Sequence, residues 1–93
     1  MSAYVIVEAS VRDSQARDRY SSLAVPTLHK FNGEILAAGP WQELLGEPAF
    51  SNGMVIRFQD KTTAIAWYQS PEYQALREFR DAALDCRFRV VGS

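Results

Sequence analysis

The segment from Ala3 to Val11, which reads AYVIVEASV, alternates between two kinds of residue. One set is small and aliphatic: Val5, Val7, Ala9 and Val11. The other set mixes apolar and polar residues: Tyr4, Ile6, Glu8 and Ser10. Because successive side chains of a strand point to opposite faces, this pattern predicts a β-strand. Its first face is expected to lie on a core, and its second face is also partly apolar.

The segment after this strand has the spacing of a helix. Apolar residues recur at steps of three and four: Ala16, Tyr20, Leu23, Ala24, Leu28 and Phe31. Asp13 precedes them and is a suitable N-cap, and Asn32-Gly33 is a suitable end. Pro26 lies inside the pattern and lacks the N–H group that a helix uses, so we expect a kink, or two helical pieces, near Val25.

Three further strand patterns follow. We expect strands at residues 34–38, 54–58 and 86–91. Gly39-Pro40 is expected to end the second strand, with a short extension over residues 41–45 and a loop over residues 46–53.

A second helical region lies between the last two strands. Asp60 is a suitable cap for a helix that buries Ala64, Ile65 and Tyr68, and Ser70-Pro71-Glu72 then restarts the helix. The expected buried stripe of this second piece is Tyr73, Leu76, Phe79 or Arg80, and Ala83.

The resulting order, β-α-β-β-α-β, predicts a ferredoxin-like α+β sandwich formed by one domain over residues 1–93. We expect a four-stranded antiparallel sheet with the helices on one face, and with the first and third strands side by side and parallel at its centre. The face under the helices is expected to carry Val5, Val7, Met54, Ile56, Phe88 and Val90. The opposite face would carry Tyr4, Ile6, Glu8, Val55, Arg57, Arg87, Arg89 and Val91. This second face is too apolar for water alone, which predicts a two-fold homodimer packed through it.

The composition of the chain limits the kinds of binding partner that we expect. The chain has 93 residues, ten basic and eleven acidic side chains, and a net charge of −1, which argues against nucleic acid as a partner. The single cysteine, Cys86, cannot form a disulfide within the chain or complete a thiolate metal site. The sequence shows neither a signal peptide nor an apolar run long enough to span a membrane. We therefore expect a cytoplasmic protein with no metal, cofactor or membrane partner.

Four segments resemble a known family: AYVIV at residues 3–7, FNGEIL at 31–36, VIRF at 55–58 and, above all, AWYQSPEYQAL at 66–76. They are similar to a small, mostly bacterial family of unknown function within the dimeric α+β-barrel superfamily, and the resemblance covers nearly the whole chain. Members more often have two glycines where this chain has Asn32-Gly33. The resemblance implies the fold and the dimer. The superfamily includes cofactor-free oxygenases, haem-degrading enzymes and lactone isomerases, but the family has no agreed catalytic motif to carry over.

Charged residues on the second face form one candidate site. In the expected sheet Glu8, Arg57 and Arg87 lie side by side, where the two guanidinium groups would lower the pKa of the carboxyl group. A surplus arginine could then bind an anionic or polar ligand. The alternative is an ionic network that fixes the register of the dimer.

The other candidate ligand contacts are one histidine and several aromatic residues. His29 is the only histidine; it could act as a polar contact, or simply interact with the dipole at the end of its helix. Trp41, Trp67 and Tyr20 could line a pocket between helices and sheet, whereas helical spacing favours core packing for Tyr20. Trp67 is expected to border a groove or the partner subunit.

Two hypotheses about function follow. The first is a small-molecule binding protein or a cofactor-independent oxygenase or isomerase, with the ligand held between helices and sheet, His29 and Arg57 as polar contacts, and Trp41 and Trp67 as walls. The second is a non-catalytic dimer whose polar sheet face only specifies association. A closed, ligand-sized cavity with His29 or Arg57 pointing inward and unpaired would favour the first hypothesis. If both residues are exposed or bonded to other protein groups, the first hypothesis loses support.

Overall fold

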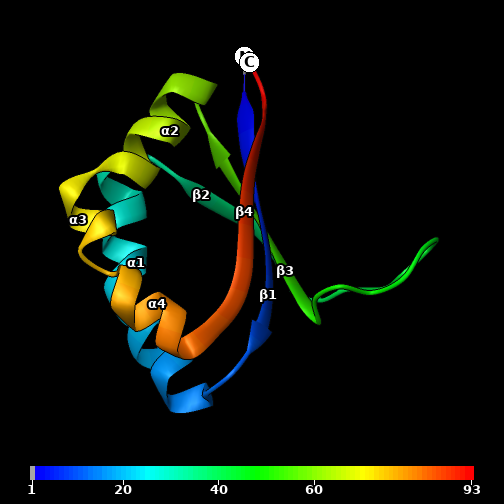
Figure 1. Cartoon of the computed structure of the whole chain (residues 1–93). Helices are drawn as coiled ribbons and strands as arrows, with labels where there is room; N and C mark the ends of the chain where they lie inside the picture. The colour runs from blue at the N-terminus through cyan, green and yellow to red at the C-terminus, as the bar shows by residue number, and fades with distance from the viewer. Residues whose placement is uncertain (1) are drawn as a thin grey trace.

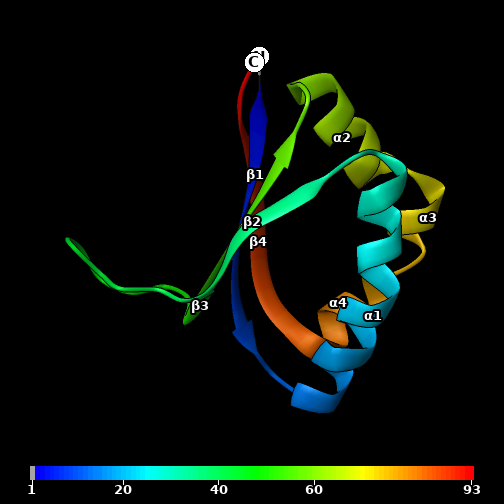
Figure 2. The ribbon, with the colours of Figure 1, turned by 180° about the vertical axis from the view of Figure 1, so that it is seen from behind.

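The structure, a computed structural model, describes residues 2–93. The elements in chain order are β1 (Ala3–Val11), α1 (Ser14–Lys30), β2 (Glu34–Pro40), β3 (Asn52–Phe58), α2 (Lys61–Gln69), α3 (Pro71–Gln74), α4 (Arg77–Ala83) and β4 (Leu84–Gly92). All helices lie on one side of a single sheet, as Figure 1 shows and Figure 2 confirms from behind. The predicted order of strands and helices is therefore confirmed, with the second helical region divided into three pieces.

The sheet has the strand order β2-β3-β1-β4, and every neighbouring pair is antiparallel. The ferredoxin-like fold is thus confirmed, but the expectation of parallel first and third strands is wrong. The crossover through α1 makes β2 parallel to β1. The β2–β3 connection then reverses the chain, so β3 is antiparallel to both of its neighbours, β1 and β2. As a result Tyr4 lies opposite Arg57 on one side of β1, whereas Glu8 lies opposite Arg87 on the other.

The core lies between the sheet and the helices. Burial alternates along β1, with Val5 and Val7 buried and the residues between them less so. The largest fully buried side chains are Trp67, Tyr73 and Phe58. We call this side of the sheet the covered face. The predicted opposite side, with Tyr4, Ile6, Glu8, Val55, Arg57, Arg87, Arg89 and Val91, is called the helix-free face.

Side-chain caps define the helix starts as predicted. The backbone N–H of Ala16 donates to Asp13 Oδ1 (3.0 Å), and that of Thr63 donates to Asp60 Oδ1 (2.7 Å). Ser70 accepts from the N–H of Tyr73 (3.2 Å) at the start of α3. These bonds satisfy N–H groups that have no partner inside the helix.

Two expectations about the helices need correction. α1 is one continuous helix through Pro26, so the division into two pieces is wrong; a proline removes a single donor and the surrounding turns remain. In α2 the buried residues are Ala64 and Trp67, while Ile65 is 39% exposed. The buried stripe of α2 therefore runs through Trp67 and not through Ile65. In α4, Phe79 is also exposed.

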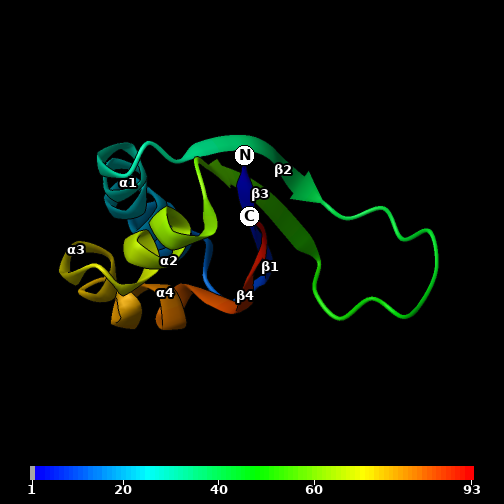
Figure 3. The ribbon, with the colours of Figure 1, turned by 90° about the horizontal axis from the view of Figure 1, so that it is seen from above.

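The second and third strands are longer than predicted. Gly39-Pro40 does not break β2, because Gly39 pairs with Gly53 and Pro40 pairs with Asn52. Proline is tolerated there since β2 is an edge strand. Residues 41–51, which we call the arm, form the connection to β3 and project on the helix-free side (Figure 3). No helix within residues 2–93 combines the length and the hydropathy required to cross a membrane.

Candidate functional site

The first hollow of the molecule lies between α1 and the sheet, and we call it the α1 cavity. Its volume is about 360 Å³. Most of its wall is apolar, and its main contributors are Val7, Ala24, Leu28, Ile35 and Ile56. Arg17, Ser21 and Asn52 also line it. A cavity of this size and polarity suits a small organic molecule.

Trp67 and Tyr20 line this cavity from the core. Trp67 is only 2% exposed, so it does not face a partner subunit, but it does border this hollow. Its indole Nε1 donates to Thr27 Oγ1 (3.0 Å), and Thr27 Oγ1 in turn donates to the carbonyl of Ala24 (2.6 Å). These bonds hold the ring against α1 and leave its polar atom satisfied.

The hydroxyl groups of Tyr20 and Tyr73 meet inside the core at 2.6 Å. Burial is the main cause that raises the pKa of both phenols above the ordinary value of 10.0. Both groups are therefore neutral at physiological pH and act only as hydrogen-bond donors or acceptors.

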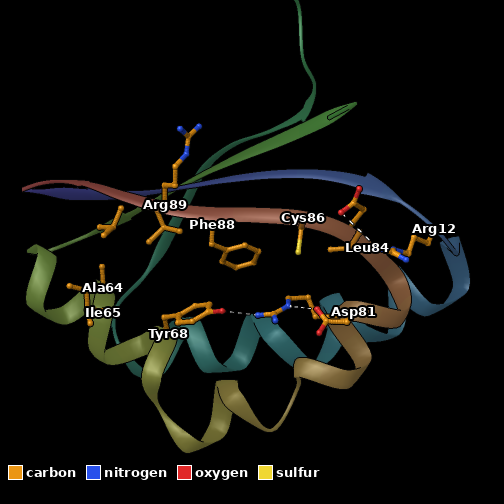
Figure 4. A pocket seen from close by; sticks show the side chains of 13 residues that line it. Arg12, Ala64, Ile65, Tyr68, Asp81, Leu84, Cys86, Phe88 and Arg89 are labelled. Atoms are coloured by element: carbon orange, nitrogen blue, oxygen red, sulfur yellow. Dashed lines mark hydrogen bonds and ion pairs between the residues drawn. The ribbon is translucent and has the colours of Figure 1, made fainter. Parts of the chain in front are cut away.

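A second hollow, the β4 cleft, opens between β4 and helices α2 and α4 and has a volume of about 400 Å³. Figure 4 shows Tyr68 and Phe88 facing its interior. Arg80 Nη1 donates to Tyr68 Oη (3.1 Å) and its Nε donates to Asp81 Oδ1 (3.0 Å). The guanidinium group lies 5.7 Å from the centre of the Phe88 ring.

Arg80 is the residue that sequence reasoning weighed only as an alternative for the buried stripe. Its side chain is 11% exposed. Burial opposes its charge, but hydrogen bonds to the Tyr73 hydroxyl and to Asp81 outweigh this effect and raise the pKa of the guanidinium group. The sequence contained one signal for this residue: Arg80 lies seven residues after Tyr73 and so falls on the same apolar stripe of the helical region. An arginine on such a stripe needs polar partners inside the protein.

The thiol of Cys86 lines the same cleft and is half-buried. Burial is the main cause that raises the pKa of this thiol. Since the thiolate is the reactive form, Cys86 is a poor nucleophile.

The ionic cluster on the helix-free face differs from the predicted one. Glu8 Oε1 accepts from Arg87 (Nε 3.0 Å, Nη2 2.9 Å) and from Arg89 Nη2 (2.5 Å). Arg57 is not part of it: because β3 is antiparallel to β1, Arg57 lies beside Tyr4 and its Nε donates to Ser2 Oγ (3.1 Å). The hydrogen bond from Arg87 is the main cause that lowers the pKa of Glu8 below 4.5.

Trp41 lies at the base of the arm on the same face. A Cβ atom on Gly53 would lie 1.9 Å from Cζ2 of the Trp41 ring, so the ring lies directly over the backbone of Gly53. Gly53 is opposite Glu8 in the sheet, and the Arg87 guanidinium group lies 5.4 Å from the centre of the Phe50 ring. Trp41 is therefore a surface residue of the helix-free face, 38% exposed, and not a wall of the α1 cavity.

The structure does not bring the five predicted ligand contacts together. Tyr20 and Trp67 share the α1 cavity, but His29 is exposed and lines a separate shallow depression near Asn32 and Glu34. Arg57 is exposed as well. The geometry therefore provides no closed site with His29 and Arg57 as inward polar contacts, and this counts against the first hypothesis in the form that the sequence suggested. Within residues 2–93, no three histidine, cysteine or acidic side chains are grouped closely enough to hold a metal ion.

Comparison with known proteins places these features in a family. The family model of a domain of unknown function (DUF1330) matches residues 2–93. No curated protein matches the chain significantly.

Several solved structures share the fold. A protein of unknown function from Rhodopseudomonas palustris, RPA0582, is 14% identical with a TM-score of 0.79, over 97% of this chain and 80% of that chain. A dimeric ferredoxin-like protein of unknown function from Jannaschia is 16% identical with a TM-score of 0.65, over 100% of both chains. SnoaB, a cofactor-independent oxygenase from Streptomyces nogalater, is 11% identical with a TM-score of 0.62, over 99% of this chain and 92% of that chain. At these identities the likeness shows the fold alone.

Proposed function

This chain belongs to the DUF1330 family, whose function is unknown, and from that premise we propose that it binds a small, largely apolar organic molecule in the α1 cavity. The observation that carries the proposal is the cavity itself. Its volume of about 360 Å³ falls within the range of about 300–1,000 Å³ that is usual for ligand sites. The hollow is partly open to solvent, so a small molecule can enter it from the surface.

The chemistry of the wall indicates the kind of molecule. Aliphatic side chains such as Leu28 and Ile56, together with the ring of Trp67, would bury an apolar ligand without leaving polar atoms unsatisfied. The Tyr20 hydroxyl is already paired with that of Tyr73. The ligand therefore gains mainly from apolar burial, and binding needs no metal or cofactor. The oxygenase activity of SnoaB belongs to that protein, and our proposal for this chain is limited to binding.

A homodimer through the helix-free face is part of the proposal. Val91 is 59% exposed, and the arm carries Leu44 and Leu45 with 95% and 97% of their surface exposed on the same side of the sheet. The Jannaschia neighbour is described as dimeric. A second copy would cover this apolar surface, and the charged cluster at Glu8 would fix its register. We also propose a cytoplasmic location, because a free half-buried thiol at Cys86 suits a reducing compartment.

The four isoleucines of the chain report on separate regions, which makes a binding test possible. Ile35 and Ile56 line the α1 cavity, Ile65 lines the β4 cleft, and Ile6 lies on the helix-free face. Toluene titrated into protein labelled at the isoleucine δ1-methyl groups should shift the NMR signals of Ile35 and Ile56 and leave that of Ile6 in place.

A cavity-filling variant provides the control. Ala24→Leu places a larger side chain at a residue that lines the cavity, and it should abolish the toluene-dependent shifts. Ala66→Leu makes the same change at an exposed residue of α2 and should bind toluene like the wild type. Unchanged Ile35 and Ile56 signals in the wild type, or full binding by Ala24→Leu, would contradict the proposal.

A further inference from the structure

The β4 cleft contains hydrogen-bond donors that the protein does not use up. Tyr68 Oη accepts from Arg80 Nη1 (3.1 Å), so the Tyr68 hydroxyl hydrogen remains free to donate. The guanidinium group of Arg80 has five N–H donors, more than Tyr68, Tyr73 and Asp81 occupy. Figure 4 shows Tyr68 in the space under β4, and Arg80 lines the same cleft. An oxygen atom placed there could accept one hydrogen bond from the Tyr68 hydroxyl group and one from the Arg80 guanidinium group. A carbonyl oxygen has the two lone pairs that this requires.

The charges around the cleft are already balanced. Arg80 pairs with Asp81, and Arg12 at the rim lies 3.8 Å from Asp85. Arg89 is committed to Glu8 on the opposite face of the sheet, and Figure 4 shows it pointing away from the cleft. An anionic ligand would add an uncompensated negative charge beside two aspartates in a half-buried space, which costs free energy. A neutral ligand that accepts hydrogen bonds avoids this cost.

The remaining wall of the cleft favours a ring. The aromatic rings of Tyr68 and Phe88 lie 5.8 Å apart, and Ala64, Ile65 and Val90 complete an apolar surface beside them. Rings 5.8 Å apart already pack against each other, so a further ring would pack against the side of the pair that faces the cleft.

We propose that the β4 cleft is a second binding site, specific for a neutral aromatic carbonyl compound. The carbonyl oxygen accepts hydrogen bonds from the Tyr68 hydroxyl and the Arg80 guanidinium group, and the ring packs against Phe88 and Ile65. The site differs from the α1 cavity, because the two linings share Leu84 and Phe88 and otherwise consist of different residues.

Acetophenone, benzoate and ethylbenzene make a matched set of probes, because they share one ring and differ in the group attached. Titrations followed by the isoleucine δ1-methyl signals should show acetophenone shifting Ile65, with benzoate binding at least about ten-fold more weakly because of its charge. Acetophenone that shifts only Ile35 and Ile56, or benzoate that binds Ile65 as tightly as acetophenone, would overturn this site while leaving the α1 cavity proposal intact.

Tyr68→Phe removes the donor and keeps the ring. It should weaken acetophenone binding about five-fold, the size expected for one neutral hydrogen bond, and leave ethylbenzene binding unchanged. Tyr4→Phe makes the same change on the helix-free face and should alter neither ligand. Equal acetophenone affinity in wild type and Tyr68→Phe, at unchanged thermal stability, would overturn the proposed role of the hydroxyl group.

Discussion

The two faces of the sheet are formed by alternate residues of the same strands, yet they differ in how complete they are. On the covered face Trp67, Tyr73 and Phe58 are fully buried. No buried side-chain nitrogen or oxygen within residues 2–93 lacks a hydrogen-bond partner. On the helix-free face an ion cluster around Glu8 lies beside exposed apolar groups such as Trp41 and Val91. The difference shows that the chain covers one face with its own helices and leaves the other exposed, and this exposed face is the one through which we propose that a second copy packs.

The two tryptophans provide the strongest test of this comparison. Trp67→Ala should lower the free energy of unfolding by about 3–5 kcal/mol, because it opens a large cavity in the core. Trp41→Ala, on the helix-free face, should cost less than about 1 kcal/mol in the isolated subunit. Urea denaturation at a protein concentration low enough to populate the monomer measures both. Equal losses for the two variants would contradict the division between a completed and an incomplete face.

A charge on the helix-free face should break the dimer. Ile6→Lys puts an ammonium group at the centre of the proposed interface and should weaken association at least about a hundred-fold. Leu23→Lys introduces the same charge at a residue of α1 that is 40% exposed and lies away from the helix-free face, and it should leave the mass of the assembly unchanged. Light scattering across a dilution series measures the masses. A wild-type protein that is monomeric throughout, or an Ile6→Lys protein that stays dimeric, would rule out this interface.

Alanine substitutions at two glycines test how rigid the packing is on the covered face and on the helix-free face. An added Cβ at Gly33 would lie 2.9 Å from the Phe58 ring, which is 1% exposed and has nowhere to move. At Gly53 the clash with Trp41 is closer, but the half-exposed Trp41 ring can swing into solvent. We therefore expect Gly33→Ala to cost about 1–3 kcal/mol and Gly53→Ala to cost less, measured by chemical denaturation. A larger loss for Gly53→Ala would show that the base of the arm is as tightly packed as the core.

The ion cluster around Glu8 should make the stability of the folded protein depend slightly on pH. The hydrogen bond from Arg87 lowers the pKa of Glu8 in the folded protein below 4.5. A depressed pKa stabilises the folded state fully above pH 4.5, and this contribution is lost as the pH falls through the folded-state value. Melting temperatures of the wild type and Glu8→Gln should therefore converge between pH 4.5 and more acidic values. Glu34→Gln, at an exposed glutamate of β2, is the matched control, and an unchanged gap between wild type and Glu8→Gln at all pH values would refute this role.

Local features were predictable from the sequence. Alternation along β1 and the caps at Asp13, Asp60 and Ser70 depend on residues close together in the chain, and the structure confirms them. The composition of the ion cluster was not predictable in this way. It depends on the relative direction of β1 and β3, which is set by the path of the chain between them, and the wrong direction placed Arg57 beside Glu8, where the structure has Gly53.

The candidate site was predictable only in part. Tyr20 and Trp67 do line one cavity, but nothing in the local pattern showed that Trp67 is in the core or that His29 lies outside. Arg80 was hidden for a related reason. Its position is favourable only because Tyr68 and Asp81 meet it in space, and a periodic pattern carries no information about such partners.

A crystal structure of the protein grown with toluene tests the central claim most directly. The account predicts electron density for one toluene molecule enclosed by Ala24, Ile56 and Trp67, with the Tyr20–Tyr73 hydroxyl pair still in place. A cavity that stays empty, or that closes because neighbouring side chains fill it, would contradict the claim that this family member holds a small molecule between α1 and the sheet.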